Sequence, residues 1–386
     1  MGVEEGKPER HHAVDWLRVL AVLLLVPYHS AVIFDKGHVS YIKDQPNAVL
    51  EAFAHFLFQW HMPLLFLLSG AATSFALGFR TGGRYAGERV RRLLIPLTFG
   101  TLAVIPILVY CQRLFYQQFQ GSYVRFYPSF FEGIYPHGNF SWGHLWFLAY
   151  LFVFSLLGLP LSLFLRKERG RKLISKLAAS CDKGGMIFLL AAPLALIEAT
   201  LRARWPGFQN LYADWANFFS CLTVFIYGYI LFSDPRFTRT IERHGKTSLR
   251  TALATMTIIF ALRWTDTAPA PKDSVTWILY MLLHGFNCWV WILAILSFAL
   301  KHLQDSNRVL PYAVEAVLPF YVLHHALVVG IGYHVVRWNT GEIEKFTVIT
   351  AASLAATLCL YDLFVRRTPV TRILFGMKPK KHLPAA

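Results

Sequence analysis

Residues 10–34 read RHHAVDWLRVLAVLLLVPYHSAVIF, and this stretch decides the fold. It opens with a charged cluster that includes Asp15 and Arg18, and then runs from Val19 to Val26 without a polar side chain. An apolar helix of this length can cross a lipid bilayer, and an ionisable residue inside such a helix is a functional candidate. His29, near the far end of the stretch, is that candidate.

The composition indicates an integral membrane protein. The chain has 386 residues, of which 55% are hydrophobic and 16% are charged, whereas soluble domains carry about 25% charged residues. Apolar runs extend along the whole length, so we expect a single membrane domain over residues 1–386, with a cytoplasmic N-terminal segment (1–13) and a basic cytoplasmic tail (366–386). No nucleic-acid-binding motif accompanies the net charge of +16, so we attribute it to cytoplasmic loops and expect no nucleic-acid partner.

Apolar runs of roughly 17–25 residues are long enough to span a bilayer as helices. The sequence predicts an all-α polytopic bundle of about ten such helices, at 14–34, 51–79, 93–111, 143–165, 186–201, 213–233, 250–264, 274–300, 309–336 and 346–365. With the N-terminus inside, 27 of the 38 Lys and Arg residues fall in cytoplasmic segments. We therefore expect both termini in the cytoplasm. Pro63 and Gly70 interrupt the second run and predict a kink there.

Helix rise converts position into depth. His29 lies 14 residues beyond Asp15, or roughly 21 Å along a helix at about 1.5 Å per residue. His324 and His325 lie 15 and 16 residues beyond Val309, in a segment that runs in the same direction. The three histidines are therefore expected at similar depth, where buried polar groups face the bundle interior.

Two segments that are expected to run from the outside to the inside place further histidines at a similar depth in the membrane. His61 and His284 each lie ten residues into their segments, after Glu51 and Ser274. Each is either part of a shared polar path or a separate interhelical hydrogen bond. A metal site needs three or four ligands, commonly with carboxylates near. Glu198 is the one acidic residue expected near that height, so the sequence predicts no metal.

A second cluster lies at the predicted cytoplasmic face. This cluster consists mainly of arginines. Arginine binds phosphate through paired hydrogen bonds, so the cluster suits a phosphorylated donor, although the positive-inside rule also explains its charge. Asp15, three residues before Arg18, is placed to pair with it on one helix face. The sequence Ser69-Gly70 lies between the two clusters, and a glycine there allows close approach of a ligand or a helix. The arginines concerned are Arg10, Arg18, Arg80, Arg84, Arg89, Arg91 and Arg92.

These residues also carry a resemblance to the acyltransferase family 3 membrane proteins. The family opens with the pattern R-x3-Φ-D-x-L-R followed by a histidine, and here Arg10, Val14, Asp15, Leu17 and Arg18 precede His29. Four further stretches match the family, and the two that begin HLWFL and PFYVLH most resemble its glucan biosynthesis branch. The further matches are FQWHMPLLFLLSG (58–70), RVRRLLIP (89–96), HLWFLAYLF (144–152) and PFYVLHHALVV (319–329).

The resemblance implies transfer of an acyl group, acetyl or succinyl, from cytoplasmic acyl-CoA to a hydroxyl of a glycan outside a bacterial inner membrane. By position, His29 resembles the catalytic histidine. Some O-antigen enzymes of the family carry an extra C-terminal domain that we do not expect in this sequence. The resemblance therefore does not identify the acceptor. The residues that resemble the donor-side set are Arg10, Asp15, Arg18, Ser69, Gly70, Arg91 and Arg92.

The sequence thus predicts a membrane acyltransferase in which His29 acts as general base. His324 or His325 would orient it or assist proton transfer, and a covalent acyl-His29 intermediate stays open. His61, Ser69 and Trp146 are candidate oxyanion donors, and His61, Trp146 and His284 are candidate lining residues. We expect acyl-CoA as co-substrate and no permanently bound cofactor. The alternatives are a transporter of a small anion or modified sugar, and a non-catalytic sensor or scaffold.

Overall fold

The computed structural model describes residues 12–135, 137–207, 209–271 and 274–378, and these residues form helices and no strand. The chain divides into two compact units. Unit 1 comprises Met1–Arg18, Gln59–Ala86 and Phe154–Val314, and unit 2 comprises Val19–Phe58, Gly87–Val153 and Glu315–Ala386.

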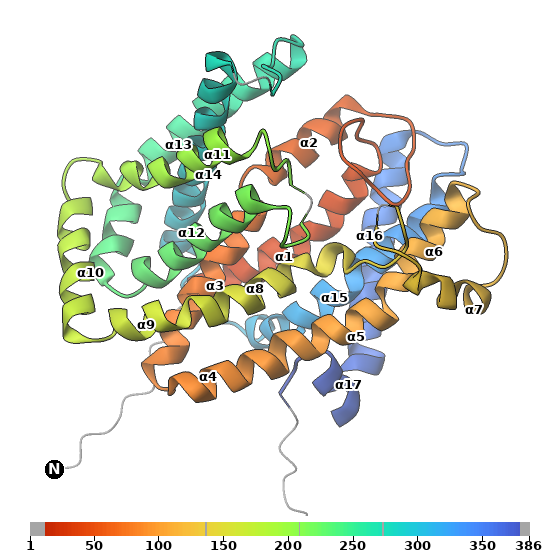
Figure 1. Cartoon of the computed structure of the whole chain (residues 1–386), viewed down its shortest axis with the longest axis horizontal. Helices are drawn as coiled ribbons and strands as arrows, with labels where there is room; N and C mark the ends of the chain where they lie inside the picture. The colour runs from red at the N-terminus through yellow and green to blue at the C-terminus, as the bar shows by residue number, and fades with distance from the viewer. Residues whose placement is uncertain (1–11, 136, 208, 272–273, 379–386) are drawn as a thin grey trace, which may run out of the picture. The chain divides into compact units, whose positions relative to one another are not determined.

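Unit 1 contains most of the middle of the chain, and Figure 1 shows its long helices α13 and α14 running along each other. Its complete helices are α3 (His61–Gly78), α9 (Leu159–Leu165), α10 (Glu168–Cys181), η4 (Met186–Leu190), α11 (Ala191–Leu201), α12 (Trp215–Leu231), α13 (Pro235–Trp264) and α14 (Val275–His302).

Unit 2 collects segments from both ends of the chain. Its complete helices are α2 (Ala48–Phe58), η1 (Val90–Leu94), α5 (Ile95–Ala103), α6 (Ile105–Phe115), α7 (Tyr123–Phe126), η2 (Tyr127–Phe131), η3 (Gly143–Leu145), α16 (Glu342–Leu360), η5 (Tyr361–Val365) and α17 (Pro369–Leu374). Four helices include residues of both units: α1 (His12–Val32), α4 (Gly82–Arg89), α8 (Trp146–Leu157) and α15 (Val309–Val335).

The all-helical expectation is confirmed, and all ten predicted apolar runs fall on helical segments. Six helical segments of the described residues are long and apolar enough to cross a membrane, and two bent pairs raise the number to as many as eight. The bends are 48° between α8 and α9 and 108° between α12 and α13. The protein is therefore an integral membrane protein, while the number of ten spans and the side of each terminus stay predictions.

The break in the second run lies elsewhere than predicted. Helix α2 ends at Phe58 and α3 begins at His61, so the interruption falls before Pro63 and not at Pro63 or Gly70. Pro63 sits in the first turn of α3, where a missing backbone N–H breaks no helical hydrogen bond.

Gly70 serves helix packing inside unit 1. A Cβ built on Gly70 would lie 1.8 Å from the carbonyl oxygen of Phe225 on α12. A Cβ on Gly228 of α12 would likewise lie 1.8 Å from the carbonyl oxygen of Leu67 on α3. The two glycines let the backbones of α3 and α12 touch, as small residues do in membrane helix pairs.

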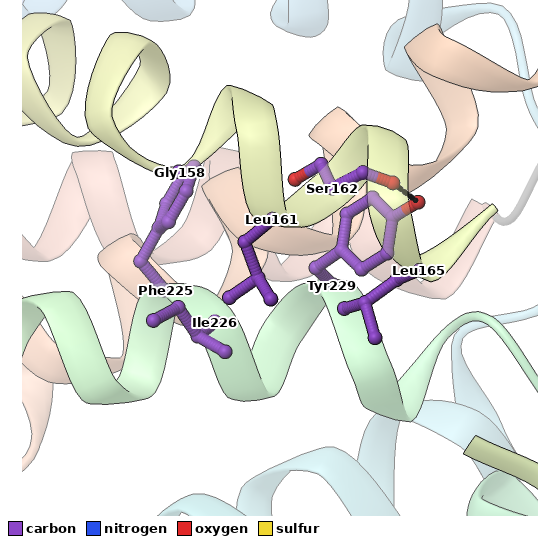
Figure 2. A pocket seen from close by; sticks show the side chains of 7 residues that line it. All are labelled: Gly158, Leu161, Ser162, Leu165, Phe225, Ile226 and Tyr229. Atoms are coloured by element: carbon purple, nitrogen blue, oxygen red, sulfur yellow. Dashed lines mark hydrogen bonds between the residues drawn. The ribbon is translucent and has the colours of Figure 1, made fainter. Parts of the chain in front are cut away.

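A small pocket in the same unit lies between α9 and α12. Figure 2 shows its seven lining residues, with the Tyr229 hydroxyl pointing at the backbone of Ser162. That hydroxyl donates a hydrogen bond to the Ser162 carbonyl oxygen at 3.0 Å. None of the lining residues is a histidine or a carboxylate. We therefore interpret the pocket as a gap in helix packing and not as a reaction site.

Candidate active site

Four histidines converge inside unit 2. The rings of His29 on α1 and His325 on α15 stack, with centroids 3.8 Å apart and planes inclined by 19°. His324 lies 5.3 Å from His29, ring to ring. His144 of η3 lies edge-on to both His324 and His325, at 5.1 Å from each. We call these four residues the histidine cluster.

The two predicted helices thus do bring His29, His324 and His325 together. His144 is a member that the sequence reasoning did not single out, although it begins the HLWFL motif. His29, His324 and His325 lie well inside their apolar runs, whereas His144 stands at the first turn of its run. Its place in that motif, beside an apolar segment, is the signal that would have found it.

The turn that holds His144 is built by three neighbours. Gly143 adopts φ +47°, and a Cβ there would lie 2.8 Å from the hydroxyl oxygen of Tyr41. Glycine is the residue that adopts this backbone conformation without steric penalty. The Tyr321 hydroxyl of α15 donates to the carbonyl oxygen of His144. A ring nitrogen of His144, Nε2, lies 3.2 Å from the carbonyl oxygen of Val322.

These hydrogen bonds assign the tautomers. A carbonyl oxygen only accepts, so His144 donates from Nε2, and in the neutral ring its Nδ1 carries the lone pair. His324 Nδ1 lies 2.7 Å from the Tyr321 carbonyl oxygen, so its Nε2 carries the lone pair. Both lone-pair nitrogens, and Nδ1 of His325, are buried without a hydrogen-bond partner among the described residues.

Exposure separates His29 from the other three rings. His144, His324 and His325 are buried, whereas His29 is only partly buried. Two imidazolium charges at stacking distance would repel strongly in a low-dielectric interior. The pair His29–His325 therefore suits the handling of one proton, with His29 as the ring that a substrate can reach.

The expected pair at the start of α1 is present. Arg18 Nη1 lies 3.4 Å from Asp15 Oδ1, on one face of the helix. Both side chains keep some exposure, at 24% and 15% of their areas. Arg10 lies outside the described residues, so its place in the donor-side set is a prediction.

The other donor-side residues are distributed over the chain. Ser69 donates its hydroxyl hydrogen bond to the Leu65 carbonyl of its own helix at 2.8 Å. Gly70 faces a helix, as described above, rather than an open space. Arg91 and Arg92 are exposed on η1, a π-helical turn of unit 2.

The candidate lining residues have partners of their own. His61 is buried beside the ring of Trp60. In unit 1, which contains both His61 and His284, His284 Nδ1 lies 3.1 Å from Oε1 of Gln59, a residue of the turn between α2 and α3. The partner of His284 is thus a turn residue and not a second helix, as the interhelical alternative had it. Trp146 is buried in unit 2 and contacts the ring of Tyr150 edge-on at 5.1 Å.

A second polar cluster of unit 2 escaped the sequence reasoning. Asp35 follows α1, and its Oδ2 lies 2.7 Å from His38 Nδ1 and 3.5 Å from His55 Nε2 of α2. Burial opposes ionisation of Asp35, but the hydrogen bonds and charge of His38 and the backbone N–H of Gly37 hold the pKa of Asp35 below its ordinary value. Glu198, the acid that the sequence considered, is paired with Arg202 in unit 1.

Comparison with known proteins assigns the family. A family model described as "Acyltransferase domain" matches residues 11–362. The chain is 26% identical over 385 residues to glucans biosynthesis protein C of Escherichia coli O81 (strain ED1a), which covers 96% of this chain and 95% of that protein. It is 25% identical over 384 residues to the protein of the same name from Shigella dysenteriae serotype 1 (strain Sd197), with the same coverage. No solved structure matches the chain significantly. The chain therefore belongs to the acyltransferase 3 family and is a membrane acyltransferase.

Proposed function

We propose that the protein moves an acyl group from cytoplasmic acyl-CoA to a hydroxyl of a glycan outside the membrane, with His29 as the general base. The observation that carries this proposal is the stack of His29 on His325 within the histidine cluster. A partly exposed imidazole beside three buried rings is suited to accept a proton near neutral pH.

In the proposed reaction, His29 removes the proton of the acceptor hydroxyl as its oxygen attacks the thioester carbonyl. The carbon–sulfur bond breaks, and the CoA thiolate leaves and takes up a proton. His325 holds the plane of the His29 ring, and His324 presents the lone pair of Nε2 to the cluster. A two-step route through acyl-His29 has the same balance. The transfer reaction itself would need no permanently bound cofactor.

We assign the CoA phosphates to the arginine side of α1. Arg18, held by Asp15, would pair with a phosphate, and Arg10, Arg91 and Arg92 are the further candidates. Fourteen residues separate Asp15 from His29 on one continuous helix, which is roughly 21 Å. An extended acyl-pantetheine arm spans such a distance, whereas a compact phosphosugar does not.

The relatives support a glucan as acceptor, because their names place them in glucan biosynthesis. We infer a periplasmic glucan or a related glycan, an acetyl or succinyl donor, and a location in the bacterial inner membrane. We further infer ten spans with both termini in the cytoplasm. Reporter fusions at the loops after α1 and α10 test that topology, since the two loops are expected on opposite sides.

The test of the function is an assay of the purified protein. It is incubated in lipid nanodiscs with acetyl-CoA or succinyl-CoA and a glucan, and free CoA thiol is measured together with the mass of the glucan. We expect thiol release that depends on the acceptor and a matching mass increase. A transporter would release no thiol, and that outcome would refute the proposed reaction. Mass spectrometry of envelope glycans with and without the gene identifies the acceptor.

A further inference from the structure

The loop after α1 and helix α2 bring metal-ligating groups together in unit 2. Asp35 and His38 lie on the loop, and Glu51 and His55 lie on α2. We propose that Asp35, His38 and His55 bind a divalent transition-metal ion, with Glu51 as the fourth ligand and zinc as the best match. This proposal does not depend on the acyl transfer reaction.

The ligand atoms of three residues lie close enough together to share one metal ion. The ligand atoms of Asp35, His38 and His55 all lie within 4.8 Å of one another. The His55 Nε2 atom is also 3.8 Å from Glu51 Oε1. Metal–ligand bonds of about 2.0–2.1 Å in a tetrahedron set ligand atoms roughly 3.3 Å apart. The separations of Asp35 Oδ2 from His38 Nδ1 and His55 Nε2, 2.7 and 3.5 Å, lie on both sides of that value, so small side-chain shifts admit the ion at these three residues. Glu51, which stands outside the group of three, would have to shift toward it to become the fourth ligand.

The carboxylate of Asp35 is held in the pose that a ligand needs. The residue is 2% exposed, and its Oδ1 accepts hydrogen bonds from the backbone N–H groups of Gly37, at 2.6 Å, and His38, at 3.1 Å. Its other oxygen, Oδ2, is the one that both imidazoles approach. Hydrogen bonds of this kind orient the ligands of metal sites.

The ligand chemistry favours zinc over calcium or magnesium. Two imidazoles and carboxylates are a typical zinc donor set, whereas the hard cations prefer six or more oxygens. Two imidazole nitrogens directed at one carboxylate oxygen crowd that oxygen, and a zinc ion would take the place of the protons between them. Binding therefore releases protons, as is usual when histidine ligands take up a metal.

The ion would tie the loop to α2 and so support the histidine cluster. The same loop carries Tyr41, whose ring meets that of His325 edge-on at 5.5 Å. Lys43 of the loop donates to the carbonyl oxygens of Val32 and Asp35, and Asp44 pairs with Lys345 at 2.8 Å. The proposed site is thus a structural metal site beside the proposed reaction centre. Its residues would position Tyr41 and would take no part in acyl transfer.

The test measures metal in the purified full chain. The protein is purified through an affinity tag that contains no histidine, and elemental analysis follows exposure to zinc and removal of loose metal with a weak chelator. We expect about one zinc per chain in the wild type and background levels in His38→Ala and His55→Ala. His334→Ala, which changes an exposed histidine at the end of α15, should retain the wild-type content.

A second measurement begins with the wild type, whose response to metal removal does not depend on any variant. A strong chelator should lower its thermal unfolding temperature, and added zinc should restore it, whereas His55→Gln should show no response to either. Glu51→Gln should still bind zinc but release it to a weaker chelator. A wild type that takes up no zinc and shows no response to the chelator would overturn the proposal, as would full zinc retention in both His38→Ala and His55→Ala.

Discussion

His29 of α1 and His325 of α15 stack face to face, with ring centroids 3.8 Å apart. The contact joins two segments that are 296 positions apart in the chain, and it fixes the plane of the ring that we assign as general base. A histidine that must accept a proton from a substrate benefits from a fixed ring orientation, because proton transfer needs alignment within hydrogen-bond reach.

Replacement of His29 tests the base directly. We expect His29→Ala to lower kcat by about 10²- to 10⁴-fold, the range typical of a lost general base, with near-normal folding because the side chain is only partly buried. Thiol release from acyl-CoA measures the rate, and size-exclusion chromatography in detergent checks the fold. His334→Ala is the matched control and should keep full activity. An active His29→Ala enzyme would remove His29 from the mechanism.

Substitutions at His325 separate stacking from proton transfer. His325→Phe keeps an aromatic ring against His29 and removes a buried nitrogen that has no hydrogen-bond partner among the described residues. We expect it to retain activity within about tenfold of the wild type, while His325→Ala, which removes the stacked ring, loses about a hundredfold. If both variants lost activity equally and changed the pH profile, His325 would be a proton carrier instead.

The turn at Gly143 gives a prediction for His144. In Gly143→Ala the new methyl group would meet the Tyr41 hydroxyl at 2.8 Å, and the backbone would be strained at φ +47°. We expect a loss of about 1–3 kcal/mol in stability and a fall in kcat, because His144 is displaced. Thermal unfolding and thiol release measure the two effects. Gly330→Ala is the control, since a Cβ there meets no described atom within 4 Å.

The sequence was sufficient for features whose signals are local. Hydropathy over a window of helix length located the apolar helices, and the number of residues from each predicted helix start placed His29, His324 and His325 at one level. The pairing of Asp15 with Arg18 followed from their spacing on a helix. Each of these inferences uses only neighbours along the chain.

The parts that the sequence did not predict depend on tertiary contacts. His144 is oriented by Tyr321, which is 177 positions away, and no periodicity reports such a contact. Asp35 and His38 lie on a loop and His55 lies on a separate helix. The pattern of apolar runs therefore does not predict that the three side chains are close together. Gly70 was correctly expected to allow close approach, but whether a ligand or a helix used that space depended on where Gly228 lies.

The crossing of α3 and α12 predicts a packing role for Gly70. The added methyl group of Gly70→Ala would lie 1.8 Å from the Phe225 carbonyl oxygen, so the two helices must separate. Overpacking of this kind costs about 1–3 kcal/mol or more, and we expect a lower unfolding temperature and a lower yield of folded protein. The folded fraction should keep a normal KM for acyl-CoA. Gly78→Ala, which meets no described atom within 4 Å, is the control. A raised KM without loss of stability would instead place Gly70 in the donor site.

The pair Asp15–Arg18 is expected to act on donor binding rather than on chemistry. Arg18→Ala removes a guanidinium that we assign to a CoA phosphate, so KM for acyl-CoA should rise by about 10- to 100-fold, the value of a hydrogen bond to a charged group, with a smaller change in kcat. Arg18→Lys keeps the positive charge but loses the paired N–H groups of the guanidinium, and Asp15→Asn removes the charged partner of Arg18. Both variants should give KM values between those of the wild type and Arg18→Ala. Lys172→Ala removes a cation from an exposed pair with Glu168 and should leave KM unchanged. If Arg18→Ala lowered kcat and left KM as in the wild type, the phosphate assignment would fail, and the arginine would have to act on the transferred group itself.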